Sequence, residues 1–398
     1  MFITGFNHLM KIKFIFSVLL IIVFSGRAFA EDIIIGIDAD MSASAAVGGE
    51  AIYRGAKIAV NEINSHGGVL GKKLVLEVKD HRANPRRGVQ NIEELLKDKN
   101  LVAVLGGVHT PVAMSQLELI HKNQLIYLSP WAAGTALVDN GYQPNYVFRL
   151  SVRDADAGEV LINHAKSRGL TRIGLLLERT VWGESNIDAL ITAAVNQGVD
   201  IVQTQWFNWS GDSFVREIKR FKESNTQAVI FVGNTPEGAV FARDLADFDD
   251  PQELPIISHW GIASGDFVTH VGLDKLSTLD LSVLQTISFV KPKNTKKAQY
   301  VLKQYKETFD KNATVESIPA VAGVVHAYDL VHLLALAITD ANTIQRDKVR
   351  DALENIKNYD GLIRFFDKPF SKNNHDALGI EDYILTRFND RGFLTPIQ

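Results

Sequence analysis

The hydrophobic pattern changes repeatedly along the chain, from short continuous apolar runs to longer stretches with an apolar residue every three or four positions. Residues 32–37 form a near-continuous apolar run and residues 101–105 a continuous one, which is typical of strands buried on both faces of a parallel sheet. Ile52, Ala56 and Ile63 instead share one helical stripe. Between residues 32 and 128 the pattern therefore predicts strict alternation of strands and helices, with all strands running in one direction.

The same alternation restarts after residues 146–150, which follow a connection containing Gly141 and Pro144. We expect further strands at 173–177, 201–205, 228–232 and 256–257, and helices that begin at about 154, 183, 214 and 236. Beyond them the pattern predicts an extended segment at 284–290, helices at about 294–309, 319–339 and 346–356, and short extended pieces within 361–388. The fold class that follows is α/β, with two doubly wound, Rossmann-like lobes.

The stretch 101–137 has the features of a ligand-binding wall. Gly106-Gly107 ends one predicted strand, and a segment of mostly small residues, 129–135, follows the next. In open α/β sheets the turns after the strand C-termini line the crevice where ligands bind. Small residues there let a ligand approach the backbone N–H groups. The alternative is a βαβ unit with ordinary turns.

The first thirty residues are predicted to be a signal peptide. Lys11 and Lys13 precede the apolar run 14–24, and Ala28-Phe29-Ala30 matches a signal-peptidase site. Met10 is an alternative start. The remaining chain of about 368 residues suggests two domains. A second apolar stretch, 321–338, contains two histidines and an aspartate, so we expect a core helix there rather than a membrane span.

Charge and cysteine content narrow the function classes further. Removing Lys11, Lys13 and Arg27 from 42 basic residues leaves 39 against 46 acidic ones, a net charge of −7. This balance argues against nucleic acid or an anionic membrane as a partner. The chain has no cysteine, which excludes disulfides, thiolate metal sites and a lipid-carrying cysteine. A protein of the bacterial periplasm fits these properties best.

Catalytic motifs are missing from the sequence. It contains no G-x-S-x-G, P-loop, G-x-G-x-x-G or H-E-x-x-H. His326 and His332 are six residues apart, which is not a one-face helical spacing, so we expect no metal and no cofactor. Glu178, Glu184 and Asp188 are interpreted as a charged helix start rather than as a general acid and base. The sequence therefore favours a protein that is not an enzyme.

Three tryptophans lie just past predicted strands: Trp131, Trp182 and Trp260. Large aromatic residues commonly belong to cores or to interfaces between lobes. At strand ends that face one crevice, they could also sandwich a small organic ligand or a cation. His109, in the turn after Gly106-Gly107, is the one histidine that we expect to touch a ligand, with a solvated turn residue as the alternative.

Several short motifs occur in the order and spacing of a known family. They are the passage from Asn61-Glu62-Ile63-Asn64 through Gly67-Gly68-Val69-Leu70-Gly71-Lys72-Lys73-Leu74, then Asp80 with Asn84-Pro85, Gly106-Gly107, Ser129-Pro130, Phe148-Arg149, Trp182-Gly183, Asp212 with Phe214, and Tyr328-Asp329. With them, the chain from about residue 32 to 396 resembles the type I periplasmic solute-binding proteins of the Leu/Ile/Val-binding class.

The resemblance implies two lobes joined by three crossovers, which close on a ligand by hinge motion. Lobe 1 would comprise residues 31–149 and about 291–374, and lobe 2 residues 150–290 and about 375–398. The ligand-binding residues carried over from the family are Val108, His109 and Thr110, then Trp131, Ala132 and Ala133, and, from the opposite lobe, Trp182, Asn234 and Trp260.

Two of these positions depart from the family's amino-acid binders. Ala133 stands where a Ser/Thr hydroxyl is usual, unless Thr135 substitutes, and Trp260 stands where an acid pairs with the ligand's ammonium group. Losing such a charge-assisted hydrogen bond weakens binding by roughly tenfold to a hundredfold. An aromatic or aliphatic carboxylate, an amide or a quaternary amine is therefore as plausible as a branched-chain amino acid.

The resemblance also implies a biological role and partners. We expect the periplasmic substrate-binding component of an ABC importer, a monomer that captures a small amino acid or a related carboxylate or amide. Its partner would be an inner-membrane ABC permease driven by a cytoplasmic ATPase. The alternative is a sensing module of the same fold that reports its ligand to a receptor or regulator.

Overall fold

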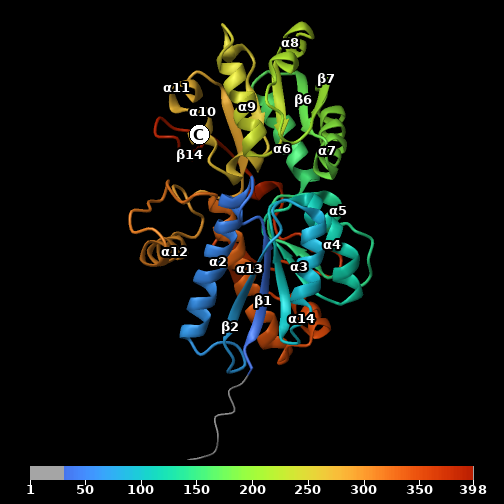
Figure 1. Cartoon of the computed structure of the whole chain (residues 1–398), viewed down its shortest axis with the longest axis vertical. Helices are drawn as coiled ribbons and strands as arrows, with labels where there is room; N and C mark the ends of the chain where they lie inside the picture. Colours follow the sequence, from blue (N-terminus) through green and yellow to red (C-terminus); the bar gives the residue numbers. More distant parts are fainter. Residues whose placement is uncertain (1–30, 398) are drawn as a thin grey trace, which may run out of the picture. The chain divides into compact units, whose positions relative to one another are not determined.

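Two large β-sheets organise the part of the chain that this computed structural model describes, residues 31–397 (Figure 1). The predicted signal peptide, residues 1–30, lies outside the described residues. The first sheet has the order β2-β1-β3-β4-β5, and all its neighbouring strands are parallel. Its strands are β1 (Ile33–Ala39), β2 (Leu74–Asp80), β3 (Leu101–Gly106), β4 (Ile126–Ser129) and β5 (Val147–Arg149).

The second sheet has the order β14-β13-β10-β9-β8-β6-β7. Its strands are β6 (Arg172–Glu178), β7 (Asp200–Phe207), β8 (Ala228–Val232), β9 (Ile256–Ser258), β10 (Leu281–Gln285), β13 (Ile384–Phe388) and β14 (Leu394–Pro396). The strands from β7 to β10 are parallel, whereas β13 and β14 extend the sheet with antiparallel pairing. The α/β class and the two lobes predicted from the sequence are confirmed, but the antiparallel edge was not predicted.

The extended segment predicted at residues 284–290 is only partly a strand. Strand β10 begins earlier, at Leu281, and ends at Gln285. Ile287 and Phe289 are buried without strand pairing, so their apolar character reflects burial in an irregular connection. Farther on, β11 (Tyr359–Asp360) and β12 (Phe365–Phe366) form a separate antiparallel pair.

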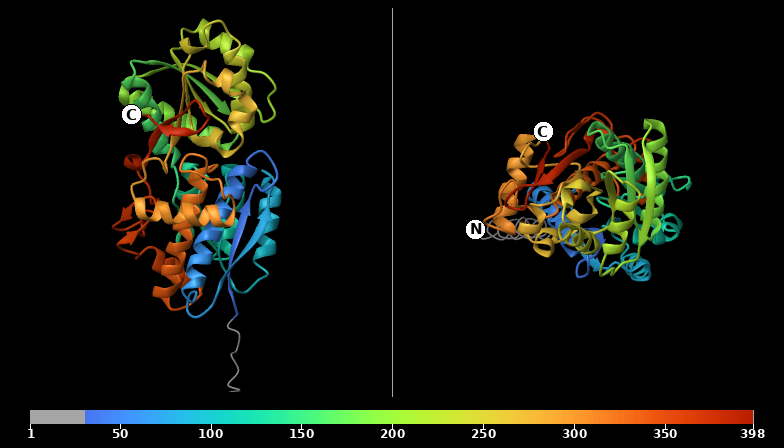
Figure 2. Two further views of the ribbon diagram at one scale, coloured as in Figure 1. Left: turned by 90° about the vertical axis from the view of Figure 1, so that its left-hand side faces the viewer. Right: turned by 90° about the horizontal axis from the view of Figure 1, so that it is seen from above.

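Helices of the first lobe come from two distant parts of the sequence. The N-terminal part supplies α2 (Ala46–Ser65), α3 (Pro85–Leu95), α4 (Thr110–Lys122) and α5 (Thr135–Val138), and the C-terminal part supplies α12 (Thr295–Thr308), α13 (Val321–Ala341) and α14 (Arg346–Leu353). Helix α2 packs against α13, and α3 packs against α4. In Figures 1 and 2 these helices surround the first sheet, so strands such as β3 are buried along their whole length, as their continuous apolar sequence predicts.

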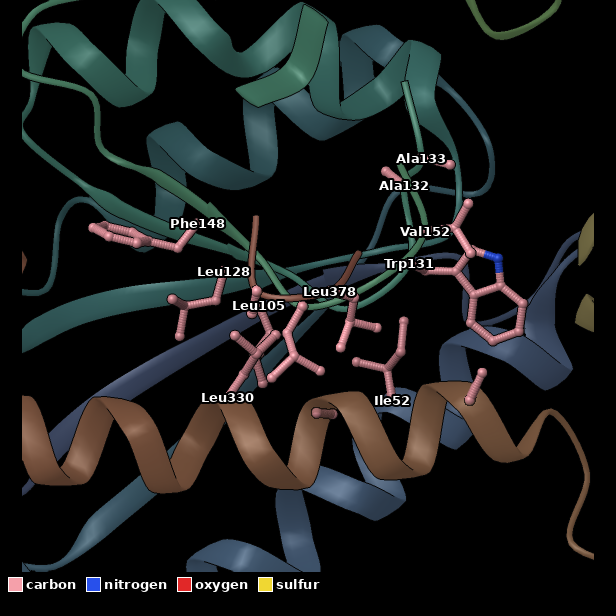
Figure 3. Close-up of a cluster of buried hydrophobic side chains, with 14 of the residues drawn as sticks. Ile52, Leu105, Leu128, Trp131, Ala132, Ala133, Phe148, Val152, Leu330 and Leu378 are labelled. Atoms are coloured by element: carbon pink, nitrogen blue, oxygen red, sulfur yellow. The ribbon is translucent and has the colours of Figure 1, made fainter. Parts of the chain in front are cut away.

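Helix α13 is long and apolar enough to span a membrane by length and composition alone. It is instead a core helix, because 83% of its most apolar window is buried inside the protein. Figure 3 shows Leu330 of this helix facing Leu105 and Leu128 at the ends of β3 and β4. Trp131 lies at one end of the same buried cluster. The cluster thus fixes the turn that carries Trp131 against α13.

The second lobe surrounds its sheet with helices of its own. They are α6 (Asp154–Ser167), α7 (Val181–Gln197), α8 (Val215–Glu223), α9 (Thr235–Ala246), α10 (Phe267–Val271) and α11 (Leu273–Leu276), with 3-10 turns η1 (Pro251–Glu253), η2 (Trp260–Ser264) and η3 (Ile380–Asp382). Thr180 caps the start of α7 by accepting a hydrogen bond from the Trp182 N–H, and Gly198 ends it at φ 66°. These caps fix where Trp182 enters the helix.

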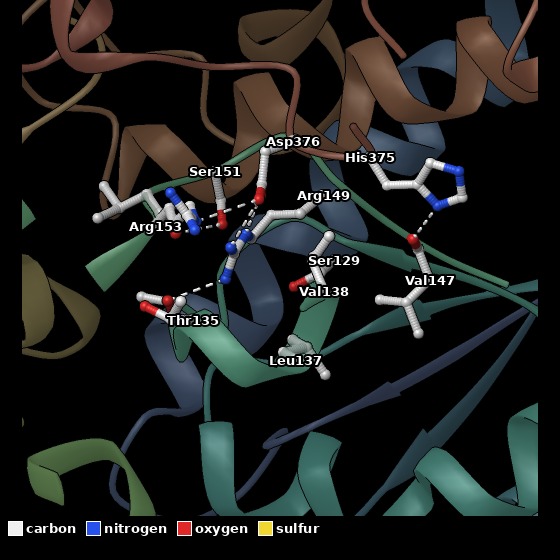
Figure 4. A network of polar contacts seen from close by, with 12 residues as sticks. Ser129, Thr135, Leu137, Val138, Val147, Arg149, Ser151, Arg153, His375 and Asp376 are labelled. Atoms are coloured by element: carbon white, nitrogen blue, oxygen red, sulfur yellow. Dashed lines mark hydrogen bonds and ion pairs between the residues drawn. The ribbon is translucent and has the colours of Figure 1, made fainter. Parts of the chain in front are cut away.

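The chain passes between the two lobes three times: after β5, after β10 and before β13. The first and third crossovers lie side by side, because the N–H of Arg149 donates to the His375 carbonyl and the N–H of Ala377 donates to the Arg149 carbonyl. Arg149 is fully buried and forms a two-bond ion pair with Asp376, at 2.5 and 3.1 Å (Figure 4). The exact lobe boundaries inferred from the sequence stay a prediction.

Candidate ligand-binding site

Residues at the C-terminal ends of five parallel strands line one small cavity between the lobes. The first lobe contributes Val108, His109, Thr110, Pro111, Trp131 and Ala133, and the second contributes Glu178, Trp182, Asn234 and Trp260. The cavity has a free volume of about 10 Å³, which is room for about one water molecule. A larger molecule can therefore enter only when the lobes separate or the tryptophan rings turn.

The turn after β3 approaches the neighbouring strand β1 very closely. A Cβ atom added to Gly107 would lie 2.9 Å from the Ala39 Cα atom and 2.6 Å from Nε2 of His81, so only glycine fits without a shift. The Thr110 hydroxyl accepts a hydrogen bond of 3.2 Å from the N–H of Gly134, in the turn after β4. The two turns of the first lobe are thus tied into one wall.

Asp40 holds His109 at this wall. The Asp40 Oδ2 atom lies 3.1 Å from Nε2 of His109, and both side chains are buried. Asp40 also accepts hydrogen bonds from the N–H groups of Ala43 and Ala45. Burial opposes its ionisation, but the bonds from His109 and these N–H groups outweigh it and lower the pKa of Asp40 to about 2. Asp40 is therefore a fixed negative charge that orients the imidazole.

Glu178, the last residue of β6, is the carboxylate of the second-lobe wall. Its side chain is fully buried and accepts hydrogen bonds from the Thr180 hydroxyl at 2.6 Å, from Nε1 of Trp209 at 3.2 Å and from Nδ2 of Asn234 at 3.2 Å. Burial is the main reason that the pKa of Glu178 is raised to about 7, although the bonds from Thr180 and Trp209 partly counter it. Within residues 31–397, no basic side chain forms an ion pair with it.

Aromatic rings form most of the remaining wall. The rings of Trp131 and Trp260, which come from opposite lobes, have centroids 5.0 Å apart. Nε1 of Trp182 donates a 3.1 Å hydrogen bond to the buried Asp154, so this indole has a fixed orientation. Trp209 lies beside His109, with centroids 5.7 Å apart, and connects it to Glu178. The arrangement offers an incoming ligand flat apolar faces beside one carboxylate.

Of the nine ligand-binding residues expected from the sequence, eight line this cavity. Ala132 does not: it is fully buried in the hydrophobic core of the first lobe (Figure 3), and its carbonyl accepts a bond from the Ser129 hydroxyl. His109 is buried, so the alternative interpretation of this residue as a solvated turn residue is wrong. That the lining residues contact a ligand stays a prediction.

The interpretation of Glu178 as part of a charged helix start is also wrong. Glu184 and Asp188 are exposed on α7, but Glu178 ends the preceding strand and faces inward. Its position directly after the apolar run 173–177 could have indicated that it ends a strand and lies at the ligand-binding edge of the sheet. Pro111 and the supporting residues Asp40 and Trp209 were missed as well. Asp40 contacts His109, and Trp209 contacts His109 and Glu178, each from a distant part of the sequence.

A second, larger concavity of about 840 Å³ lies between α4–α5 and α6–α7. Thr110 borders both it and the small cavity. The N–H of Thr135 donates to the Ser185 hydroxyl at 3.1 Å across this groove, from one lobe to the other. Its carboxylates are exposed to solvent, so it resembles an entrance between the lobes more than an enclosed binding site.

The two histidines considered as a metal pair have separate structural roles. His326 is buried, with Nδ1 2.7 Å from the Pro130 carbonyl and Nε2 2.8 Å from the Thr286 hydroxyl. Burial lowers the pKa of His326 to about 4, so it is neutral and fixes the turn before Trp131. His332 instead faces Glu62 at 3.3 Å. In the described part of the chain, no group of three or more His, Cys, Asp or Glu side chains could hold a metal ion.

Comparison with known proteins identifies the family. The family model for periplasmic binding proteins matches residues 32–392, so the chain belongs to this family. A curated relative, the Leu/Ile/Val-binding protein homolog 3 of Brucella melitensis, is 26% identical over 320 residues, which cover 76% of this chain and 85% of the relative. The chain is therefore a periplasmic binding protein, similar to Leu/Ile/Val-binding proteins, and not an enzyme.

Solved structures show the same fold. A type 1 periplasmic binding protein from Bordetella pertussis Tohama I is 22% identical with a TM-score of 0.83, covering 92% of this chain and all of that one. An ABC transporter solute-binding protein from R. palustris, solved in complex with benzoate, is 15% identical with a TM-score of 0.76, covering 92% and 96%. At these identities the likeness establishes the fold alone.

Proposed function

We propose that this protein is the periplasmic substrate-binding component of an ABC importer. It captures a small amino acid, or a related carboxylate or amide, between two closing lobes. The observation that carries the proposal is the cavity between the strand ends of both lobes, with Trp131 on one side and Trp182 and Trp260 on the other. Because neither lobe encloses this cavity alone, ligand binding and lobe closure are one event.

The hinge geometry supports this proposal. The ion pair of Arg149 with Asp376 joins two crossovers, and Arg149 also donates from Nη1 to the carbonyls of Ala133 and Gly134 at 2.9 and 2.8 Å. The hinge therefore contacts the cavity wall directly. If the lobes separate while this network stays intact, the network serves as the hinge, and it lies beside the binding site.

Export and partnership complete the proposal. We expect the signal peptide to be cleaved after Ala30, and the exported monomer to deliver its ligand to an inner-membrane permease. Mass spectrometry of protein recovered from the periplasm should give an N-terminus at Glu31, and light scattering should give the mass of one chain. Retention of residues 1–30, or a stable dimer, would remove the corresponding part of the proposal.

Ligand capture is tested with residues 31–398 in a thermal-shift screen, followed by isothermal titration. The panel contains branched-chain amino acids, amides, aliphatic and aromatic acids, and quaternary amines. A ligand at one hundred times its Kd adds about 2.7 kcal/mol to the free energy of unfolding, which raises Tm by a few degrees. Small-angle scattering should show a smaller radius of gyration with the ligand bound.

The matched control is a tryptophan that does not line the cavity. Trp182→Ala should abolish the ligand-induced shift, whereas Trp206→Ala, on β7 beside Arg179, should retain it. If the whole panel fails to stabilise the wild-type protein, or if both variants respond alike, this cavity is not the capture site.

A further inference from the structure

Glu178 is the buried carboxylate that lines the cavity, and no opposite charge pairs with it among the described residues. Its three hydrogen-bond donors, Thr180, Trp209 and Asn234, are all neutral. By contrast, Arg149 is paired with Asp376, and Asp40 faces His109. Three neutral donors hold a carboxylate in one orientation but leave its negative charge to be compensated from the cavity.

The rest of the cavity wall suits a positive group. None of its ten lining residues is Lys or Arg, and its one histidine, His109, directs Nε2 to Asp40. The faces of tryptophan rings attract cations through the ring quadrupole, and three of the lining residues are tryptophans. A carboxylate with aromatic rings around it is a combination that binds ammonium groups.

We infer that Glu178 is the counter-ion for a positively charged amine or quaternary ammonium group of the ligand. This inference rests on the proposed function and narrows its ligand class. In the family's amino-acid binders, the acid that pairs with the ligand's ammonium group stands at the position of Trp260, after β9. Here we assign that role to Glu178, at the end of β6. The ammonium group would lie against Glu178, and its substituents against the indoles of Trp182 and Trp260.

A ligand whose only charged group is a carboxylate fits this wall poorly. It would bring a second negative charge toward Glu178, in a region where Glu237 of α9 and Asp154 of α6 already repel negative charge. Burial raises the pKa of Glu178 to about 7, so the carboxylate is ionised above neutrality and protonated in mild acid. Binding of a permanent cation should therefore weaken as the pH falls.

The test compares ligands of one shape that differ in charge. Residues 31–398 are titrated by calorimetry at pH 8 with choline and its neutral isostere 3,3-dimethyl-1-butanol, and with leucine, 3-methylbutylamine and 4-methylpentanoate. We expect at least one amine-bearing compound to bind more tightly than its uncharged or purely anionic counterpart. Glu178→Gln should weaken that binding tenfold to a hundredfold.

The control variant is Glu217→Gln, which changes a buried second-lobe glutamate that pairs with Arg216 and does not line the cavity. Its affinities should equal those of the wild type. Should Glu178→Gln fail to fold, a pH series on the wild type decides instead. The affinity for the amine should fall at least tenfold between pH 8 and 5.5, whereas that for a neutral isostere should not change. In a folded Glu178→Gln protein the same series should be flat, which separates Glu178 from His109.

The possible failures are distinguishable. Preference for 4-methylpentanoate or an aromatic acid over the amines, or amine binding that is equal in Glu178→Gln, overturns the charge assignment and leaves the capture function standing. Absence of binding for amines, carboxylates and amides alike overturns both.

Discussion

The indole rings of Trp131 and Trp260 meet across the two lobes, with centroids 5.0 Å apart and ring planes inclined by 32°. One ring follows β4 of the first sheet and the other follows β9 of the second. Their contact is therefore part of the closed arrangement of the lobes as well as part of the ligand cavity.

This contact should be measurable as an interaction free energy. In a double-mutant cycle of Trp131→Leu and Trp260→Leu, urea unfolding should give a coupling of about 0.5–1.5 kcal/mol, typical of aromatic pairs. The same cycle with Trp131→Leu and Trp206→Leu, two rings that do not meet, should be additive within about 0.5 kcal/mol. Equal coupling in both cycles would mean that the interlobe contact contributes nothing specific.

Asp40 should stabilise the fold through its ionised form. Its pKa is lowered from an ordinary 3.8 to about 2, so the contribution is complete above pH 3.8 and is lost as the pH falls through 2. Asp40→Asn should cost about 2 kcal/mol of unfolding free energy at pH 6, and clearly less near pH 2. Denaturant unfolding at both pH values measures this, with the exposed Asp188→Asn as control. A loss that does not depend on pH would show that the carboxylate charge is irrelevant.

Glu178 should have the opposite effect on stability. Its pKa is raised from 4.5 to about 7, so the folded state holds the proton more tightly, and stability is lost as the pH rises from 4.5 to about 7. Glu178→Gln, without ligand, should be more stable than the wild type at pH 8.5 by up to about 3 kcal/mol, and nearly equal to it at pH 5. Thermal unfolding across this pH range provides the measurement, and Glu217→Gln should show no such trend. A destabilised Glu178→Gln at pH 8.5 would contradict the prediction.

The hinge ion pair should matter far more than an ion pair on the surface. Asp376→Asn leaves the fully buried Arg149 without its counter-charge, which costs about 3–5 kcal/mol for buried pairs. Glu94→Gln, which breaks the exposed pair with Lys79 at 3.2 Å, should cost less than about 1 kcal/mol. Urea midpoints of the two variants test the contrast. Similar losses would argue that the crossovers are held by their backbone hydrogen bonds alone.

Much of the architecture could be predicted from local pattern. Continuous apolar runs mark the strands β1, β3, β6 and β8, because strands covered on both faces need apolar residues throughout. The antiparallel pairing of β13 and β14 could not be predicted, because nothing in their local sequence indicates that β13 pairs with β10 at the edge of the second sheet. Likewise, the apolar residues Ile287 and Phe289 indicated burial but not whether the backbone would pair.

The sequence by itself determined where candidate ligand contacts occur along the chain. Neighbouring parallel strands end at one edge of a sheet, so the residues just past them, such as His109 after β3 and Trp131 after β4, converge at that edge. The family motifs added Asn234 and Trp260 to the same set.

Only the tertiary structure decided how these residues are paired and charged. Asp40 contacts His109, which is 69 positions away in the sequence, and Glu178 accepts a hydrogen bond from Asn234, which is 56 positions away. Arg149 pairs with Asp376, which is 227 positions away. Such contacts depend on strand order and on the packing of one lobe against the other, which local periodicity does not encode. Burial also decides the charge of Glu178, because exclusion of water, and not residue type, sets how easily a carboxyl group ionises.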